Sequence, residues 1–235
     1  WDLGAAKPFE SQPEIVKELL GGRTNSTFLV AAADCFAVVR VNSPISASLG
    51  INRQRERQLL KLLQSTGVVP QTYFSADEVL VSQYIAGRPM LDDASETDHT
   101  MQLLSAALQR VQAVNIDGMA CRRYLEYCRE YIGQLSEAAL LRMPTAAMEV
   151  AAAAIDAGDW QSVICHHDLV PENIIINDRG VFILDWEYAA IGHPGLDSLR
   201  LFSFGYDRCL DEAAKTEPLF QLQQAMDQLW LAVQQ

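Results

Sequence analysis

The chain is short of basic residues. It has 18 Lys and Arg against 30 Asp and Glu in 235 residues, which gives a formal net charge of −12. Nonspecific binding of nucleic acid requires a basic surface, so this composition argues against a nucleic-acid partner. The acidic balance is compatible with a small cationic substrate, although an acidic surface more often serves solubility alone.

Cysteines are few and scattered, and no stretch is both long and apolar. The five cysteines form no C-x-x-C pair, which argues against a zinc site and a disulfide framework and makes a reducing cytoplasm the simplest localisation. No segment approaches the length needed to cross a bilayer, and the opening residues WDLGAAKPFE contain no apolar signal core. We expect no membrane partner, and the composition leaves the oligomeric state open.

The first part of the chain alternates short apolar stretches with helical spacing. In order, the patterns predict a helix over 13–20, strands over 24–33 and 35–41, a helix over 51–66 and strands over 71–74 and 78–85. Gly67 is the expected stop of the second helix. This order predicts a small antiparallel sheet with one helix packed against it.

The second part of the chain is mainly helical. Helical spacing covers 93–114, 121–135, 144–157, 195–207 and 211–234. Ser95 or Thr97 is the expected N-cap of the first of these helices. The composition shifts near 86–92, which predicts two lobes, residues 1–87 and residues 88–235, with a hinge near 83–88.

The chemistry is concentrated between residues 164 and 187. This stretch places His166 and Asp168 ahead of Asn173, and Asp185 follows a predicted hairpin. Carboxylate and amide oxygens are the ligands that Mg²⁺ prefers, and Mg²⁺ takes few protein ligands when it also binds phosphate. The spacing favours such a site over the plainer alternative, a buried hairpin with an Asn cap and an unrelated Asp.

The predicted hairpin turns at the sequence NDRG. With residues 178–180 as the loop, Asn177 lies opposite Val181, and counting outward places Asn173 opposite Asp185. Directly opposed residues have Cβ atoms about 4.5–5.5 Å apart. An error of one residue in the register would keep the two side chains close but could turn one of them to the other face.

These motifs resemble those of a known group of enzymes. The pattern H-x-D-L-x-x-x-N is met by His166, Asp168, Leu169 and Asn173, and it resembles the catalytic loop of protein-kinase-like phosphotransferases. The sequence DWEYA at 185–189 resembles the choline/ethanolamine kinase and aminoglycoside phosphotransferase branch. The resemblance implies an α+β fold of the bilobal protein-kinase type, with the site in the cleft between the lobes.

The resemblance also implies a role for each motif residue. Asp168 would be the catalytic base that deprotonates an acceptor hydroxyl, and Asn173 and Asp185 would hold Mg²⁺ on the phosphates of ATP. His166 and Asp197 would support the catalytic loop. Each of these roles is an expectation carried over from the family.

Two other histidines near the motifs receive no chemical role. His167 stands where the family usually has Gly or Asn, which is a mild departure from the pattern. His193, in the segment GHPGLDSLRLF, is expected to be an exposed loop residue.

The first lobe contains candidates for the nucleotide site. The glycine turn at 21–26 resembles the G-x-T-N turn of the family, and its backbone N–H groups could reach phosphates, although a plain turn is the alternative. The residues expected there are Thr24, Asn25 and Ser26. Arg40 stands where protein kinases place their phosphate-binding Lys, and an exposed residue at a strand end is the plainer interpretation.

A second candidate lies on the helix predicted over 51–66. Glu56 follows Ile51-Asn52-Arg53 as in the I-N-R-x-x-E of choline kinases, so we expect it to pair with Arg40 and not to be a solvated charge. The sequence VSQYIAGRPM then resembles the hinge between lobes. The hinge residues expected beside the adenine ring are Gln83, Tyr84 and Ile85.

The acceptor is the least determined part of the prediction. Trp186, Glu187 and Tyr188 place an acid between two aromatic residues, a composition that suits an ammonium or quaternary amine. Trp230 is a further candidate for a ring face, although a Trp on an amphipathic helix is more often part of the core. We therefore predict an ATP- and Mg²⁺-dependent kinase for the hydroxyl of a cationic amino alcohol such as choline or ethanolamine. Thiamine or an aminoglycoside is the alternative acceptor, and a catalytically silent nucleotide-binding regulatory domain is the alternative of another class.

Overall fold

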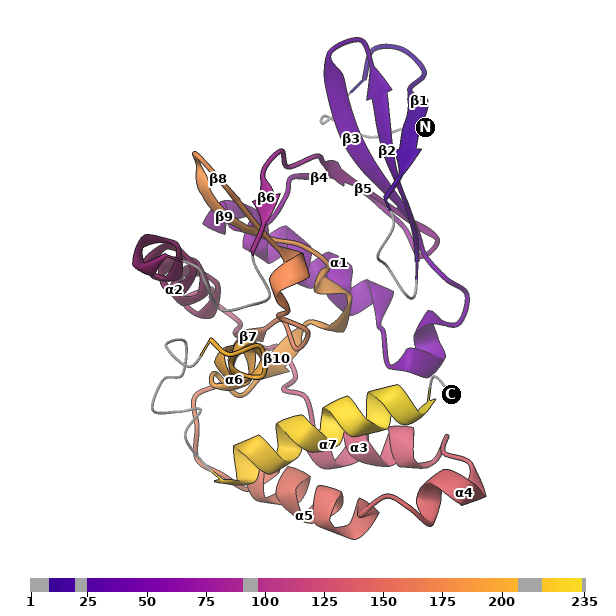
Figure 1. Cartoon of the computed structure of the whole chain (residues 1–235), viewed down its shortest axis with the longest axis vertical. Helices are drawn as coiled ribbons and strands as arrows, with labels where there is room; N and C mark the ends of the chain where they lie inside the picture. The colour runs from indigo at the N-terminus through magenta and orange to yellow at the C-terminus, as the bar shows by residue number, and fades with distance from the viewer. Residues whose placement is uncertain (1–8, 20–24, 91–96, 207–216, 234–235) are drawn as a thin grey trace.

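The computed structural model describes residues 9–19, 25–90, 97–206 and 217–233. A five-stranded sheet lies at one end of the molecule and a group of helices at the other (Figure 1). Helix α1 (Arg53–Leu63) and two smaller sheets lie between them. The α+β architecture with a small antiparallel sheet is as predicted, and the proposed division at residue 87 remains a prediction.

The five-stranded sheet is antiparallel with the order β1-β2-β3-β5-β4. Its strands are β1 (Glu14–Glu18), β2 (Ser26–Ala32), β3 (Cys35–Val41), β4 (Thr72–Ser75) and β5 (Val79–Gln83). The last four were predicted from the sequence, including the turn between β2 and β3.

The helix predicted over 13–20 is wrong, because residues 14–18 form the edge strand β1. Every residue of β1 is exposed, so the segment has no buried stripe that could hold a helix against the core. The β-branched Ile15 and Val16 suit extended backbone, and pairing with β2 decides the outcome. Residue 20 lies outside the described residues.

Helix α1 is defined at both ends by local signals. Asn52 caps it, accepting a hydrogen bond from the backbone N of Arg55 at 2.9 Å. It continues into a 3₁₀ turn, η2 (Gln64–Thr66), and stops at Gly67, which has φ of 67°. Its buried residues are Glu56, Leu59, Leu60 and Leu63. A carboxylate therefore lies on the apolar face of the helix.

The hairpin at 174–183 consists of β8 (Ile174–Asn177) and β9 (Gly180–Ile183), and β6 (Arg88–Pro89) pairs with β8. The predicted register is wrong by one residue. Asn177 pairs with Gly180, because this glycine, at φ of 121°, joins the ladder and leaves a two-residue loop. Asn173 consequently lies opposite Leu184, whose N donates to the Asn173 carbonyl at 2.8 Å.

A two-stranded sheet holds both ends of the chemically dense stretch. Strand β7 (Val163–Cys165) precedes the catalytic loop and pairs with β10 (Ala190–Gly192), which follows the DWEY segment. Cys165 lies directly opposite Ala190. The loop and the hairpin between these strands are therefore anchored on a common base.

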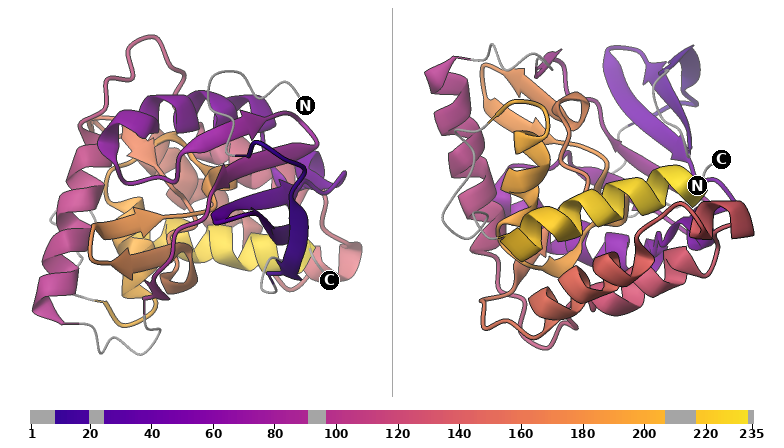
Figure 2. Two further views of the ribbon diagram at one scale, coloured as in Figure 1. Left: turned by 90° about the horizontal axis from the view of Figure 1, so that it is seen from above. Right: turned by 60° about the horizontal axis from the view of Figure 1, so that its bottom comes forward.

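The remaining helices are α2 (Asp98–Gln112), α3 (Tyr124–Ile132), α4 (Glu137–Leu140), α5 (Thr145–Asp156), α6 (Leu196–Phe202) and α7 (Glu217–Val233). Of these, α3, α4, α5 and α7 form the far end of the molecule, whereas α2 and α6 lie beside the two smaller sheets (Figure 1). Thr97 is the N-cap of α2, and Ser95 lies outside the described residues. Helix α7 runs alongside α3 and α5 and shares a core with them (Figure 2). Among the described residues, no helix is both long and apolar enough to span a membrane.

Candidate active site

The catalytic loop is fixed by Asp197, the acid at the start of α6. Its carboxylate is 1% exposed and accepts hydrogen bonds from the backbone N of His166 at 2.8 Å and of His167 at 2.9 Å. Burial raises the pKa of Asp197, although the two N–H groups and the nearby His166 act in the opposite direction. The structure thus brings Asp197 to the loop, as the family resemblance implied.

His166 joins the loop to the end of the hairpin. Its Nε2 lies 2.7 Å from the carbonyl of Leu184, and its Nδ1 accepts from the backbone N of Asp168 at 3.3 Å. A carbonyl can only accept, so Nε2 is the donor in this contact. His166 is fully buried, and its ring links the loop to the end of the hairpin; its supporting role in the site stays a prediction.

His167 has a left-handed backbone, with φ of 64°. The side-chain Nδ1 donates to the Cys165 carbonyl at 3.2 Å, so Nε2 is the acceptor of the Tyr124 hydroxyl, also at 3.2 Å. Enclosure of the ring lowers the pKa of His167 well below its ordinary value, and Arg122 adds to the effect. The neutral ring, held by two hydrogen bonds, therefore keeps His167 in a left-handed backbone conformation. Gly or Asn would adopt this conformation at a lower cost in free energy.

His193 was predicted to be exposed, and that prediction is wrong. Its side chain is 6% exposed and packs against Trp160, with the ring centroids 5.0 Å apart. Its backbone N donates to the Tyr124 hydroxyl at 2.9 Å. A polar residue in a Gly- and Pro-containing segment suggested a surface loop, but β10 carries this segment into the core.

Asp185 follows the hairpin at φ of 56° and ψ of 64°, which re-aims its side chain at the end of β9. Its Oδ1 accepts from Nη1 of Arg40 at 3.0 Å. The surrounding packing and the repulsion of Glu187 and other acids raise its pKa to about 7, despite the attraction of Arg40. Asp185 therefore lies in a region of excess negative charge, and its side chain is 37% exposed.

The predicted pair between Arg40 and Glu56 is present. Nη2 of Arg40 lies 2.6 and 2.8 Å from the two carboxylate oxygens of Glu56, and both side chains are buried. Burial alone would lower the pKa of Arg40, but three surrounding carboxylates raise it above its ordinary value. Arg40 therefore joins the sheet, helix α1 and Asp185 at a single guanidinium.

A second arginine of this cluster, Arg53, was not predicted as a site residue, and its side chain is 9% exposed. Arg53 donates to Glu56 and to Glu187, both at 2.9 Å, and to the side chain of Asn25 at 3.0 Å. Its Nε is a buried nitrogen without a hydrogen-bond partner in the part of the chain that the structure describes. The signal was present in the sequence, because the I-N-R motif places this arginine three residues before Glu56.

The residues predicted to bind the acceptor are mostly enclosed. Glu187 is 2% exposed and contacts Arg53 and, at 2.7 Å, the side-chain amide of Asn25. Trp186 is also 2% exposed, and its Nε1 donates to the carbonyl of Ile183 at 2.9 Å. This geometry favours a role for both in joining elements, and direct contact with an acceptor stays an untested prediction.

Tyr188, the last of the residues predicted to bind the acceptor, is hydrogen-bonded to Trp230 on α7. Trp230 Nε1 donates to the Tyr188 hydroxyl at 3.0 Å, and Tyr188 is 7% exposed. Burial raises the pKa of Tyr188, so its hydroxyl stays protonated. This pair joins α7 to the DWEY segment.

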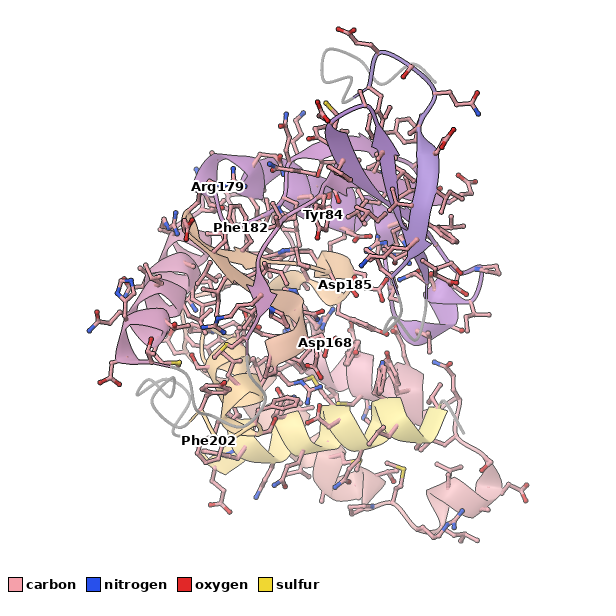
Figure 3. All side chains as sticks on the ribbon, turned by 45° about the horizontal axis from the view of Figure 1, so that its top comes forward. Tyr84, Asp168, Arg179, Phe182, Asp185 and Phe202 are labelled. Atoms are coloured by element: carbon pink, nitrogen blue, oxygen red, sulfur yellow. The ribbon has the colours of Figure 1, made fainter. Side chains whose placement is uncertain are left out.

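Asp168 lies nearer α7, and Asp185 lies toward the sheet (Figure 3). The Asp168 side chain is 34% exposed, and its Oδ1 lies 3.3 Å from Nη2 of Arg200 on α6. Nη1 of the same guanidinium lies 3.2 Å from the carboxylate of Asp227 on α7. No motif singled out Arg200 or Asp227, because both become relevant only when α6 and α7 meet beside the catalytic loop.

The other predicted positions are distributed as follows. Asn173 donates its amide to the carbonyl of Asp168 at 3.1 Å, which leaves its oxygen available as a ligand. Ser26 begins β2, Gln83 ends β5, Tyr84 is 36% exposed and Ile85 is buried. Thr24 lies outside the described residues.

A buried arginine–glutamate pair, a re-aimed acid at the end of a hairpin and a second acid on a clamped loop together define a class. Protein-kinase-like phosphotransferases use such parts to hold a nucleotide with its metal and to orient the acceptor hydroxyl. A family model described as "Phosphotransferase enzyme family" matches residues 15–229, and the chain belongs to this family.

Individual relatives show more distant similarity. LicA of Haemophilus influenzae is 24% identical over 203 residues, 80% of this chain and 58% of LicA. Ethanolamine kinase 2 of Mus musculus is 23% identical over 176 residues, 70% of this chain and 45% of that protein. The chain thus spans about half the length of these relatives.

The fold is that of solved kinases of this family. The crystal structure of choline kinase LicA from Streptococcus pneumoniae matches with a TM-score of 0.72 and 22% identity, covering 93% of this chain and 86% of that one. This similarity confirms the predicted kinase-like fold. The family match confirms the resemblance noted in the motifs.

Proposed function

We propose that the chain transfers the γ-phosphoryl group of ATP to a hydroxyl of a cationic amino alcohol such as choline or ethanolamine. The observation that carries the proposal is the placement of two acids, Asp168 on the clamped loop and Asp185 beside the Arg40–Glu56 pair. One acid is suited to the acceptor and the other to the metal–phosphate side. The names of the relatives support the choice of acceptor.

Magnesium fits the residues on the metal side. Asp185 has an accessible carboxylate with a raised pKa, so a cation there would relieve repulsion among the neighbouring acids. Asn173 offers an amide oxygen. Among the described residues no group of three or more His, Cys, Asp or Glu forms a metal cage, and Mg²⁺ on a nucleotide needs only one or two protein ligands. We infer that Asp185 and Asn173 hold the ion, which when bound would neutralise phosphate charge.

The chain's own residues would do the rest by positioning. Arg40 lies next to Asp185 and can contact a phosphate oxygen, while Glu56 and Arg53 keep it in place. Asp168 would accept the proton of the acceptor hydroxyl. The segment from Gln83 to Ile85 is proposed to contact the adenine ring with its backbone.

A screen of ADP release tests the proposal. Choline, ethanolamine, thiamine and aminoglycosides are offered with ATP, with and without Mg²⁺, to the wild type and to Asp168→Asn. We expect Mg²⁺-dependent release with an amino alcohol and a loss on the order of 10²–10⁴-fold in the variant. Turnover of thiamine or an aminoglycoside alone would select the alternative acceptor. An unchanged rate in Asp168→Asn would exclude Asp168 as the base, and nucleotide binding without any turnover would favour a silent regulatory domain.

A further inference from the structure

The carboxylate proposed as the catalytic base already has a cationic partner. Arg200 reaches Asp168 with Nη2 at 3.3 Å and Asp227 with Nη1 at 3.2 Å. Gln223 Nε2 donates to Oδ1 of Asp227 at 3.0 Å. The guanidinium therefore bridges the catalytic loop and α7 at the place where an acceptor would approach Asp168.

This bridge is weaker than the arginine pairs on the nucleotide side. Its contacts of 3.2–3.3 Å are longer than the 2.6 and 2.8 Å between Arg40 and Glu56. Its three side chains are 21%, 34% and 35% exposed, whereas those of Arg40 and Glu56 are 9% and 4% exposed. Long contacts between partly exposed charges contribute little free energy, so another cation can displace the guanidinium.

A cationic acceptor must compete with Arg200 for the position beside the Asp168 carboxylate. A two-carbon amino alcohol whose hydroxyl lies on Asp168 carries its ammonium within a few ångströms of that carboxylate. The space beside Asp168 toward α7 is the space that the Arg200 guanidinium occupies. Two cations cannot share it without strong repulsion, whereas either alone is attracted to the two acids.

We propose that Arg200 is an internal counter-ion of Asp168 and that a cationic acceptor displaces it on binding. This inference rests on the function proposed above. Arg200 is then a specificity-determining residue, because it fills the cation position until an acceptor of matching charge arrives. A neutral alcohol cannot replace it and gains nothing from the two acids.

The test compares choline with its neutral isostere 3,3-dimethylbutan-1-ol as acceptors. Arg200→Gln and Arg200→Met remove the competing charge, and we expect the KM for choline to fall roughly five- to tenfold, the range for loss of two partly exposed ion pairs. The KM for the isostere should stay within about twofold of the wild type, a margin of about 0.4 kcal/mol in free energy, so the ratio of the two KM values should change. Arg200→Lys keeps a cation and should retain a KM for choline near that of the wild type.

Arg129→Gln is the matched control, because it removes an exposed arginine that pairs with Glu149 away from the site. It should leave both alcohols unaffected. A fall in kcat for both alcohols with unchanged KM values would mean that Arg200 merely positions Asp168, and it would overturn the inference. Unchanged discrimination between the two alcohols would also overturn it. Failure of the wild type to use any amino alcohol would instead overturn the proposed function, and this inference with it.

Discussion

Arg40 donates to Asp185 across 145 positions of the chain, with Nη1 and Oδ1 3.0 Å apart. The arginine belongs to the five-stranded sheet and the acid to the end of the β8–β9 hairpin. Glu56 on α1 holds the other end of the same guanidinium. This contact therefore fixes how the sheet, α1 and the hairpin meet, and the site exists only when all three are assembled.

Glu56→Gln should destabilise the protein and reduce phosphotransfer. The substitution keeps the shape of the side chain but leaves the buried guanidiniums of Arg40 and Arg53 with less counter-charge. Loss of one partner of a buried pair costs roughly 3–5 kcal/mol. The free energy of unfolding by urea measures the effect. Glu149→Gln on α5, which removes an exposed partner of Arg129, is the control and should change little.

Asp185→Asn should make the folded protein more stable at alkaline pH. The pKa of Asp185 is raised to about 7, so protonated Asp185 stabilises the fold, and this contribution is lost as the pH rises through 7. Without Mg²⁺, the variant should therefore melt at a higher temperature than the wild type at pH 8, with a smaller difference at pH 6.

Magnesium provides the complementary measurement. Added Mg²⁺ should raise the melting temperature of the wild type at pH 8 by binding the ionised carboxylate, and it should have less effect on Asp185→Asn. ADP release should disappear when EDTA removes the ion from the wild type. A variant that is less stable than the wild type at pH 8 and equally responsive to Mg²⁺ would contradict the role of Asp185.

His167→Asn should reduce the loss of folding stability that accompanies a decrease in pH. The pKa of His167 is lowered well below its ordinary value of about 6.5, so the unfolded chain binds a proton that the folded one does not. Stability is then full above pH 6.5 and falls as the pH decreases, by at most about 1.4 kcal/mol per pH unit for one group. Asn accepts the left-handed backbone and does not titrate.

Unfolding curves at pH 7.5, 6.5 and 5.5 measure this slope in the wild type and in His167→Asn. His99→Asn, which removes an exposed histidine from α2, controls for the loss of any histidine. Equal slopes for the wild type and His167→Asn would show that His167 does not contribute to acid sensitivity.

The sequence predicted what depends on local patterns and on motif order. Helix α1, strands β2–β5 and the pair of Arg40 with Glu56 were all found, because periodicity and spacing carry them. The hairpin register failed by one residue, because only the backbone shows whether Gly180 belongs to the loop or to the ladder. The segment at 14–18 is a strand only because β2 lies beside it.

Features that depend on long-range packing were beyond prediction. The exposure of His193 was misjudged, because nothing local indicates that Trp160 covers its ring. Arg200 and Asp227 meet only because α6 and α7 cross beside the catalytic loop. The enclosure of Glu187 follows from Arg53 and Asn25, which come from distant parts of the chain.

The pairing of β7 with β10 closes the segment 163–192 on itself. Its internal contacts, including those of His166 with Leu184 and of Asn173 with Asp168, join residues close in sequence. Such a segment has little loop-closure entropy to overcome and can assemble early as one cooperative unit. Arg40 and Glu56 must then dock onto a preformed surface. A ligand bound at Asp185 would therefore stabilise the contact between two parts of the chain that fold at different stages.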